Sequence, residues 1–510
     1  MNVLILGASM LLGALTFVGQ DVPGLRVGPV RSLTGQGATN FRQCDLDADG
    51  AADLLLPGAV VFQRNGSFPA QARQALPDFG ESPLVDVWAG ALYFRLRGRL
   101  AIFHWAGTEW RCDLDQALSW PPQEEVFEGV RATPTHGSAP ARLQRFLYDL
   151  DGDNTPELVA VNAAGVYLYT RREGLYGGAA PLPVFPALRL SSEPAQALWP
   201  AQSRHILFPA RQMACRFFLD GEVLRVLTRE EGAEGLAAWG AQSVRYVCTA
   251  YPLRGAAAWT VRQDAVARVC SEALPAHLQP CRLNGDGVID YAGGQWEVSE
   301  TSVLPVPIYA TWATLDGGKT FYVQRAPSLQ HARPHCSFVD FEGDGDLDMV
   351  AEATGLFDGG PRETLERFLT RSAVDHSIRI HVQGNGRFAN TPSLTARLTI
   401  ALAYPPCQQG PMFERYRAAE LINVTGDFNG DGYRDLVVRD RADRLSIYLA
   451  AGFAYPSERE AVVSIPAPGH FGVADVNADG QSDLVVRWRV GESGEGAELC
   501  RVYYAREVLQ

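Results

Sequence analysis

One stretch decides how this chain folds: Asp427-Phe428-Asn429-Gly430-Asp431-Gly432-Tyr433-Arg434-Asp435, which runs at once into the apolar residues Leu436-Val437-Val438. Oxygen-bearing side chains occupy positions 1, 3, 5 and 9 of the stretch, and glycine occupies position 6. Alternate residues of a tight loop direct their carboxylates toward one centre, and calcium takes roughly six to eight oxygen ligands. Position 6 has to turn with positive φ, which glycine adopts freely and asparagine tolerates. The stretch therefore predicts a calcium loop that leads into a buried strand.

The same pattern recurs in six places, which begin at residues 45, 149, 282, 340, 427 and 475. One match could arise by chance, but six indicate an internal repeat. The alternative, a solvated turn, would leave several carboxylates repelling one another with no cation between them. Five copies are complete, and they predict about five structural calcium ions. Their expected ligands are Asp45, Asp47, Asp49, Asp53, Asp149, Asp151, Asp153, Glu157, Asp340, Glu342, Asp344, Asp348, Asp427, Asn429, Asp431, Asp435, Asp475, Asn477, Asp479 and Asp483.

The copy that begins at residue 282 is weaker than the others. It offers Asn284, Asp286 and Asp290, but Arg282 stands where the first ligand belongs. The guanidinium of Arg282 is expected to take the place of the ion. We therefore expect this loop to be free of metal or to bind it weakly.

An EF-hand opens with the same pattern, but it needs a bidentate glutamate at position 12 and a helix after it. Position 12 is apolar in all five complete copies, where it is Leu56, Ala160, Ala351, Val438 and Val486. Apolar and β-branched residues in this place are typical of a buried strand. The loops are therefore predicted to join two strands.

The loops also predict the architecture. After each loop come a strand, a hairpin turn such as Asn65-Gly66 or Asn385-Gly386, and another strand, so that one unit has about four antiparallel strands. The spacing of the loops leaves room for further units at 84–105 and near 205–219, which makes eight units, or seven if one of these is spurious. Radially repeated four-stranded units are the pattern of a β-propeller. Only 35 residues follow Asp475, so residues 25–33 are expected to supply the outer strand of the last blade.

The loops resemble the FG-GAP/VCBS repeat family, the calcium-bearing propeller of integrin α-subunit heads and of many secreted bacterial proteins. The best match begins at Phe471-Gly472 and continues through the loop 475–483. The match ends after the loop, where Arg487-Trp488-Arg489 stands in place of the family's Gly-Ala-Pro. This departure places the chain nearer to the bacterial proteins with VCBS repeats than to an integrin head. The resemblance implies calcium ligands at positions 1, 3, 5 and 9 of each loop, location in the secreted fraction or at the cell surface, and a role in adhesion.

Composition limits the partners. Among 510 residues, 58 Asp and Glu against 45 Lys and Arg give a formal net charge of −13, which disfavours nucleic acid and anionic membranes. About a third of the acidic residues lie at ligand positions of the loops. Five bound calcium ions would offset ten of the thirteen net negative charges, so the net charge mostly reflects the metal sites. With 50 Gly and 32 Pro, the chain is too rich in helix breakers for a coiled coil or helical bundle.

The sequence predicts a short N-terminal leader followed by one domain. The apolar run at residues 3–18 is too short to span a membrane and suits a secretory signal, so 1–20 are expected to form a signal peptide cleaved near Gly19 and Gln20. The alternative is a buried first strand. Residues 21–510 then form a single propeller domain with insertions near 181–200 and 354–376, and the mature chain carries no membrane span. Three apolar residues of the second insertion recur at helical spacing: Leu365, Phe368 and Leu369.

No catalytic constellation stands out in the sequence. His331 and His335 are four apart, but Pro334 prevents a helix that would place them on one face. No Gly-x-Ser-x-Gly or His-Glu-x-x-His motif occurs. The leading hypothesis is a secreted, non-enzymatic calcium-binding propeller that binds protein or glycan. The alternatives are a calcium-dependent polysaccharide-degrading enzyme, similar to eight-bladed lyases, and a scaffold domain of a surface complex.

Overall fold

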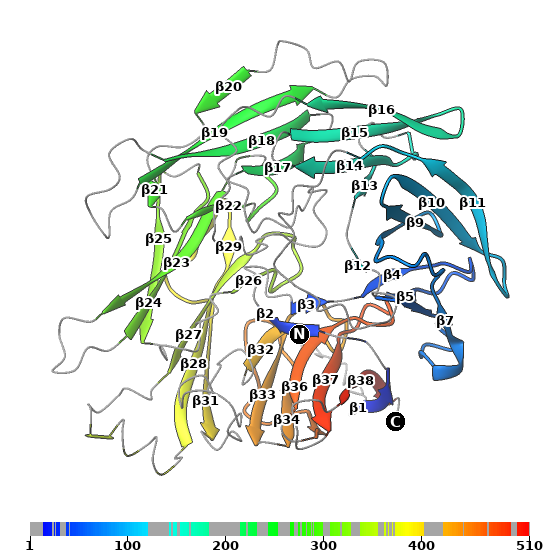
Figure 1. The fold of residues 1–510 in the computed structure, drawn as a ribbon. Helices are drawn as coiled ribbons and strands as arrows, with labels where there is room; N and C mark the ends of the chain where they lie inside the picture. The colour runs from blue at the N-terminus through cyan, green and yellow to red at the C-terminus, as the bar shows by residue number, and fades with distance from the viewer. Residues whose placement is uncertain are drawn as a thin grey trace, which may run out of the picture.

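A computed structural model gives the fold of the chain (Figure 1). It describes these residues: 14–22, 25, 27–30, 37–39, 41–120, 142–143, 146–149, 153–162, 165–182, 215–220, 223–231, 243–252, 266–269, 274–275, 278–281, 283–286, 288, 290–298, 307–316, 319–327, 337–354, 362–363, 366, 370, 373–401, 422–441, 443–466, 469–490 and 497–508. Among them, no helix has the length and apolar character needed to cross a membrane.

The described chain is all-β, as predicted, and most of its strands form four-stranded antiparallel sheets. The first half contains four large sheets, two of which carry an additional strand. Their strands are β4 (Arg42–Cys44), β5 (Asp53–Leu56), β6 (Ala59–Val61) and β7 (Arg73–Ala75); β8 (Leu84–Trp88), β9 (Ala91–Leu96), β10 (Arg99–Trp105) and β11 (Trp110–Ala117), with β12 (Arg142–Leu143) parallel to β8; β13 (Leu147–Tyr148), β14 (Glu157–Asn162), β15 (Gly165–Arg172) and β16 (Leu175–Leu182); and β17 (Cys215–Asp220), β18 (Val223–Glu231), β19 (Ser243–Pro252) and β20 (Val266–Val269), with β21 (Leu274–Pro275) on β19.

The second half contains four more sheets of four strands each. Their strands are β22 (Gln279–Cys281), β23 (Asp290–Val298), β24 (Pro307–Thr314) and β25 (Tyr322–Pro327); β26 (Ser337–Val339), β27 (Asp348–Thr354), β28 (Ala373–His381) and β31 (Leu394–Ala401); β32 (Ile422–Gly426), β33 (Asp435–Arg441), β34 (Arg444–Tyr448) and β35 (Ala461–Ser464); and β36 (His470–Ala474), β37 (Asp483–Val490), β38 (Ala497–Val508) and β1 (Ala14–Asp21). Two small hairpins complete the described strands: β2 (Val27–Val30) with β3 (Gly37–Thr39), and β29 (Gln383–Gly384) with β30 (Arg387–Phe388).

Each acidic loop connects the first two strands of its sheet. The residue at position 9 begins the second strand: Asp53 begins β5, for example, and Asp435 begins β33. The apolar residues that follow are buried in the sheet, as the burial of Leu54, Leu55 and Leu56 shows. The prediction of strand–loop–strand units is therefore confirmed, and the EF-hand reading is excluded.

The described residues form eight sheets of four or five strands, as many as the units counted from the repeat. Strands β8 to β11 form the first of the two units expected without an acidic loop. The second contains β17 to β20, and β17 includes the predicted segment Phe217-Phe218-Leu219. The other predicted part of that unit, 205–208, lies outside the described residues.

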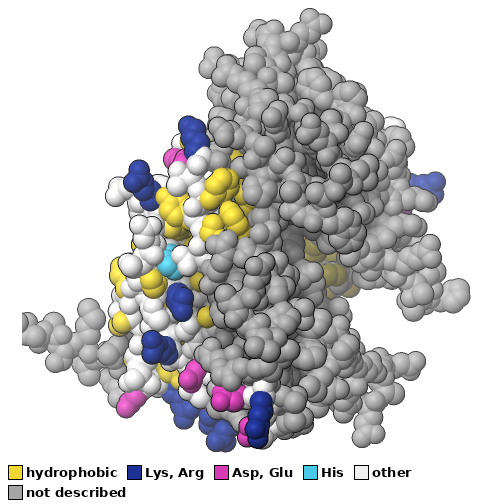
Figure 2. Space-filling model, turned by 90° about the vertical axis from the view of Figure 1, so that its left-hand side faces the viewer, with side chains coloured by type: hydrophobic (Ala, Val, Ile, Leu, Met, Phe, Trp, Pro, Cys, Tyr) yellow, Lys and Arg dark blue, Asp and Glu magenta, His cyan; other side chains and the backbone are white. Residues whose placement is uncertain are grey.

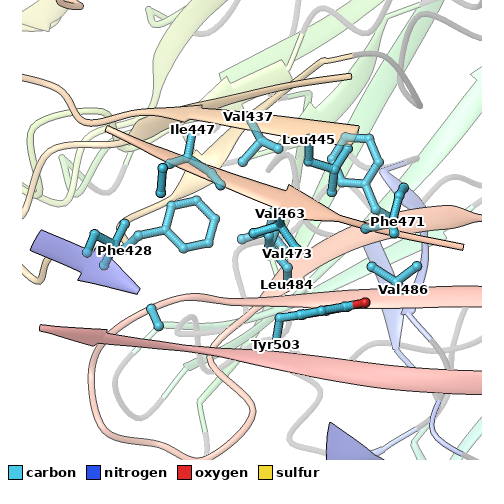
Figure 3. Close-up of a cluster of buried hydrophobic side chains, with 14 residues drawn as sticks. Phe428, Val437, Leu445, Ile447, Val463, Phe471, Val473, Leu484, Val486 and Tyr503 are labelled. Atoms are coloured by element: carbon cyan, nitrogen blue, oxygen red, sulfur yellow. The ribbon is translucent and has the colours of Figure 1, made fainter. Parts of the chain in front are cut away.

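Neighbouring sheets share hydrophobic cores. In Figure 1 the sheets follow one another around the molecule in chain order, from blue through green to red. The core between the sheets of β33 and β37 illustrates the packing (Figure 3), where side chains from both sheets interdigitate. It includes Phe428, Val437, Leu445, Ile447, Val463, Phe471, Val473, Leu484, Val486 and Tyr503. Burial of such side chains, at about 25 cal/mol per Å² of apolar surface, is the main force that holds adjacent sheets together.

The last sheet packs against the first. Leu54, Leu56 and Phe68 of the first sheet share a buried cluster with Val485 and Tyr504 of the last. Between them lie Val22, whose N–H donates to the carbonyl of Cys500 (3.1 Å), and Leu25. The segment after β1 therefore joins the two ends of the series of sheets.

The outer strand of the last sheet is β1, not residues 25–33 as expected. Strand β1 pairs antiparallel with β38 from Ala14 opposite Val508 to Asp21 opposite Arg501, and the two strands lie side by side in Figure 1. Its alternation directs Leu15 into the core and leaves Val18 exposed. Residues Val27–Val30 pair with β3 instead. Strand β1 offers eight residues for pairing with β38, whereas Val27–Val30 are four residues and include Pro29, which has no N–H to donate.

Strand β1 overlaps the expected signal peptide. Residues Ala14–Asp21 include the end of the apolar run and the expected cleavage neighbourhood at Gly19 and Gln20. Cleavage there would remove most of the strand. The cleaved signal peptide therefore stays a prediction, and residues 1–13 lie outside the described part of the chain.

The insertions are described only in part. Residues 183–200 lie outside the described chain, as do Leu365, Phe368 and Leu369 of the expected helix. The described residues Arg362, Glu363, Glu366 and Thr370 have helical backbone and are exposed. On the face shown in Figure 2, basic and acidic side chains of the described residues are interspersed and form no field of a single sign.

We predict that Leu15→Ala destabilises the protein by about 2–5 kcal/mol, because it opens a cavity in the core that β1 shares with β37 and β38. Val18→Ala is the matched control on the same strand, since Val18 is 47% exposed, and it should change stability by less than about 0.5 kcal/mol. Thermal unfolding of the purified protein measures both. Equal stability of the two variants, as expected if residues 1–20 were removed, would contradict the placement of β1.

Candidate metal centres

The acidic loops share one backbone conformation. Position 6 has positive φ in all five complete copies, as predicted, at Gly50, Asn154, Gly345, Gly432 and Gly480. Position 4 also has positive φ in four of them, which the sequence did not reveal because alanine fills two of these places. The residues at position 4 are Ala48, Gly343, Gly430 and Ala478. An alanine in this region is strained by about 1–2 kcal/mol, so the loop maintains the conformation against its cost.

The carboxylates at positions 1 and 5 also hold the turn. In the 427 loop, one oxygen of Asp427 accepts the N–H of Gly432 (2.9 Å), and Asp431 accepts the N–H of Tyr433 (2.9 Å). The corresponding bonds recur at Asp45 (3.1 Å), Asp149 (3.2 Å), Asp340 (3.2 Å) and Asp475 (3.0 Å) for position 1. These bonds turn the side chains inward toward the centre of the loop.

The first loop brings three carboxylates together. One oxygen from each of Asp45, Asp47 and Asp49 lies within 4.8 Å of the others, as ligands of one ion would. Oδ1 of Asp45 and Oδ1 of Asp47 are buried and accept no hydrogen bond from the described residues. Buried carboxylate oxygens without a partner are costly. A cation at the centre of the loop would satisfy both.

A guanidinium already approaches this loop. Arg64, in the turn after β6, contacts Asp47 Oδ2 at 2.8 Å and Asp49 Oδ2 at 3.1 Å. The pKa of Arg64 is raised, first through its hydrogen bond to Asp47. The sequence suggested that Arg282 would replace an ion in the third loop, but Arg282 lies outside the described residues. In the described chain, a guanidinium contacts the loop carboxylates at the first loop instead. The sequence did not predict this contact, because Arg64 lies outside the loop pattern.

The 340 loop has a buried acidic pair. Oδ1 of Asp340 is buried with no hydrogen-bond partner among the described residues. Burial and the nearby Glu342 raise the pKa of Asp348 to about 9, and burial raises the pKa of Glu342 as well. Two carboxyl groups this close cannot both ionise in a poorly solvated site without a compensating cation.

Asparagine occupies position 3 in the last two loops. Its amide donates to the position-5 carboxylate, from Asn429 to Asp431 (2.9 Å) and from Asn477 to Asp479 (2.8 Å). The amide oxygen of Asn429 also accepts the N–H of Asp431 (3.2 Å). Both loops thus bring three oxygen-bearing side chains to one turn with fewer charges than the first loop.

The remaining loops are described less fully. In the 149 loop, Asp149, Asp153 and Glu157 are described and Asp151 is not. In the 282 loop, Asn284 and Asp286 follow the common turn, because Asn284 accepts the N–H of Asp286 (3.2 Å) and Asp286 that of Val288 (2.7 Å). Asp290 is fully buried at position 9.

Position 9 holds the loop to the sheet. In the 427 unit, Asp435 Oδ2 accepts the N–H of Phe428 at position 2 (2.6 Å), and Oδ1 accepts the N–H of Ala450 after the third strand (2.8 Å). Equivalent pairs of bonds form at three other loops. They are Asp53 with Leu46 and Gln63 (2.9 and 2.9 Å), Asp348 with Phe341 and Gln383 (2.8 and 2.7 Å), and Asp483 with Val476 and Ala505 (2.9 and 3.2 Å).

The position-9 carboxyls are therefore structural groups as well as expected ligands. Burial raises the pKa of Asp53 to about 6, of Asp435 to about 7 and of Asp483 to about 8, although the hydrogen bonds to N–H groups act in the opposite direction. Since each oxygen has two lone pairs, one N–H bond still leaves room for a cation.

Position 2 anchors the loop in the core. This residue is apolar in every copy, and it is buried wherever its side chain is described: Leu46, Leu283, Phe341, Phe428 and Val476 are at most 3% exposed. Its role was missed from the sequence. The signal was present, because an apolar residue invariably separates the first two oxygen ligands.

Comparison with known proteins gives one family match. Residues 427–486 match the model of the FG-GAP-like repeat, which spans the last two acidic loops. No curated protein matches the chain. Among solved structures, the chain is similar to the V. cholerae biofilm matrix protein Bap1, with 10% sequence identity, 94% of this chain and 88% of that chain covered, and a TM-score of 0.26.

We predict that Asp435→Ala destabilises the protein by roughly 2–6 kcal/mol even in the presence of a chelator, because two buried N–H groups lose their acceptor. Asp443→Ala is the control, since Asp443 lies exposed in the turn between β33 and β34 of the same sheet. Thermal unfolding in chelator compares the two. If both variants unfold at the temperature of the unmodified protein, position 9 has no structural role apart from metal binding.

Proposed function

We propose that this chain is a calcium-stabilised β-propeller that serves as a non-enzymatic binding or adhesion module for a protein or glycan outside the cytoplasm. The observation that carries the proposal is the repeated acidic loop, whose first copy brings one carboxylate oxygen from each of positions 1, 3 and 5 within 4.8 Å of one another. The FG-GAP-like repeat at residues 427–486 supports it.

Calcium fits the donor set of these loops. The side-chain donors are all hard oxygens, which suit calcium rather than a softer transition metal. The unpartnered oxygens of Asp45, Asp47 and Asp340 indicate where a cation is needed. Asp45, Asp47, Asp49 and Asp53 would hold the ion in the first loop, and the corresponding residues in the other four. Bound calcium would supply the positive charge that keeps these crowded carboxyls ionised.

The arrangement of cores supports a closed ring of eight blades. Described hydrophobic clusters connect the first sheet to the second, the second to the third, the fifth to the sixth, the sixth to the seventh, and the seventh to the eighth. A further cluster connects the eighth sheet to the first. In the proposed ring, the unit of β17 to β20 lies between the third and fifth sheets.

The proposed binding role rests on the difference between the repeated frame of such a fold and the insertions that the frame carries. The strands and acidic loops form the rigid frame, and insertions between them are free to vary and to contact partners. The insertions near 181–200 and 354–376 are the proposed contact regions. Sites of extracellular modules bind calcium at about 10⁻⁴–10⁻³ M, so a location outside the cytoplasm is where the loops would be filled.

Calcium at 10 mM should raise the thermal unfolding midpoint by several degrees, and chelator should reverse the effect. Each site with a Kd of about 10⁻⁴–10⁻³ M adds roughly 1.4–2.7 kcal/mol at this concentration, because the ion binds only the folded loop. Magnesium at the same concentration is the control for ionic strength. A midpoint that does not respond to calcium or chelator would rule out the proposed role of the loops.

Arg64→Gln should increase the calcium affinity of the first loop several-fold. The guanidinium of Arg64 competes with the ion for Asp47 and Asp49, and the substitution removes its charge. The effect is modest because Arg64 is 45% exposed and can move into solvent. Arg111→Gln is the control, since Arg111 pairs with Glu109 away from the loops. Competition titration against a chelating dye measures both, and a weaker first site in Arg64→Gln would mean that Arg64 assists the ion.

A further inference from the structure

The acidic loops are joined to one another by hydrogen bonds between neighbouring sheets. At the junction of the last two loops, Ser482 at position 8 of the 475 loop donates its N–H to the carbonyl of Asp427 (2.6 Å). Its hydroxyl oxygen accepts the N–H of Asp427 (2.9 Å). Asp427 is position 1 of the preceding loop and one of its expected metal ligands. Ser482 therefore binds both the backbone N–H and the backbone carbonyl of a ligand residue in the neighbouring loop.

The same link recurs at other junctions. Arg434, at position 8 of the 427 loop, donates its N–H to the carbonyl of Phe341 and its Nε to the carbonyl of Asp340 (both 2.9 Å). Leu347, at position 8 of the 340 loop, donates its N–H to the carbonyl of Leu283 (2.7 Å). Position 8 is therefore a general point of attachment to the preceding loop.

The links continue from the last sheet to the first. Gln43 donates its amide to the carbonyl of Asp475 (2.8 Å), and Gln63 donates its amide to the carbonyl of Asn477 (2.7 Å). Gln63 is also the residue whose N–H binds the position-9 carboxylate Asp53 (2.9 Å). Hydrogen bonds thus connect the loops at 282, 340, 427, 475 and the first sheet in one series.

The loops also touch directly. A Cβ placed on Gly343 would lie 3.1 Å from the carbonyl oxygen of Gly432, so the 340 and 427 loops meet backbone to backbone. A rearrangement of one loop on binding an ion therefore reaches its neighbour with no intervening solvent.

We propose that Ser482 is a positioning residue for the metal site of the 427 loop, through which ion binding at the 475 loop strengthens ion binding at the 427 loop. An ion in the 475 loop would hold positions 5 and 9, which lie on either side of Ser482: Asp479 accepts the N–H of Gln481 (2.9 Å), the residue before Ser482, and Asp483 follows Ser482 directly in the sequence. Ser482 in turn fixes Asp427. The coupling is reciprocal, as any equilibrium coupling between two sites must be. This inference rests on the proposed function.

Terbium provides the test, because a tryptophan next to the 427 loop sensitises the luminescence of a bound lanthanide. Tyr433→Trp introduces this reporter at position 7 of the loop. The terbium luminescence of the reporter protein minus that of the unmodified protein is then the signal of the 427 site. Terbium is titrated into the reporter protein alone and into the reporter protein with Ser482→Ala or with Asp479→Ala. Ser446→Ala is the matched control, since Ser446 is a buried serine of β34 that binds Asp440 (3.0 Å) rather than a loop.

We expect Ser482→Ala and Asp479→Ala each to raise the terbium midpoint at the 427 site at least about fivefold, the lower end of typical couplings, and Ser446→Ala to leave it unchanged. Equal midpoints in all four proteins, with terbium bound, would overturn the coupling and leave the proposed function intact. Absence of terbium binding in every protein, including the reporter alone, would refute the proposed function. Calorimetric calcium titration of Ser482→Ala without the reporter repeats the comparison, and thermal unfolding in chelator verifies that each variant is folded.

Discussion

The structure depends on one interaction that four of the five complete acidic loops repeat: a buried carboxylate at position 9 that accepts two backbone N–H groups. In the 427 unit, Asp435 binds the N–H of Phe428 in the loop and that of Ala450 after the third strand. The same carboxylate begins the second strand. It therefore determines where the loop ends, how the loop lies over the sheet, and where the position-2 side chain enters the core. The loop and the sheet beneath it form a single structural element.

This interaction also accounts for part of the negative charge of the loops, since each loop has more carboxylates than a turn of this shape requires. A buried carboxylate at position 9 adds its charge to those of the other acidic side chains of the same loop, and burial raises the pKa of Asp435 to about 7. Arg64 reduces the charge at the first loop. We propose that calcium does so in all five complete loops, the first included. The formal net charge of −13 thus reflects the frame of the molecule more than the surface that a partner meets.

Much of the fold could be predicted from the sequence because the loop pattern carries its own geometry. Oxygen residues at alternate positions, glycine at position 6 and an apolar run after position 9 specify a loop between two strands, and the structure agrees. The units without acidic loops followed from spacing alone. The outer strand of the last sheet was placed wrongly, because the pairing of β1 with β38 joins residues about 490 positions apart and has no local signal. The contact of Arg64 with Asp47 and the bond between Ser482 and Asp427 were missed for the same reason, since both depend on how the chain packs.

Whether the acidic loops hold calcium in the folded chain is decided by counting the bound ions. Native mass spectrometry of the protein, exchanged into a volatile buffer with and without calcium, measures the number bound. We expect about five calcium ions per chain, and one fewer when Asp427→Ala and Asp431→Ala together remove two ligands of a single loop. A chain that carries no calcium at millimolar concentration, while remaining folded, would contradict it.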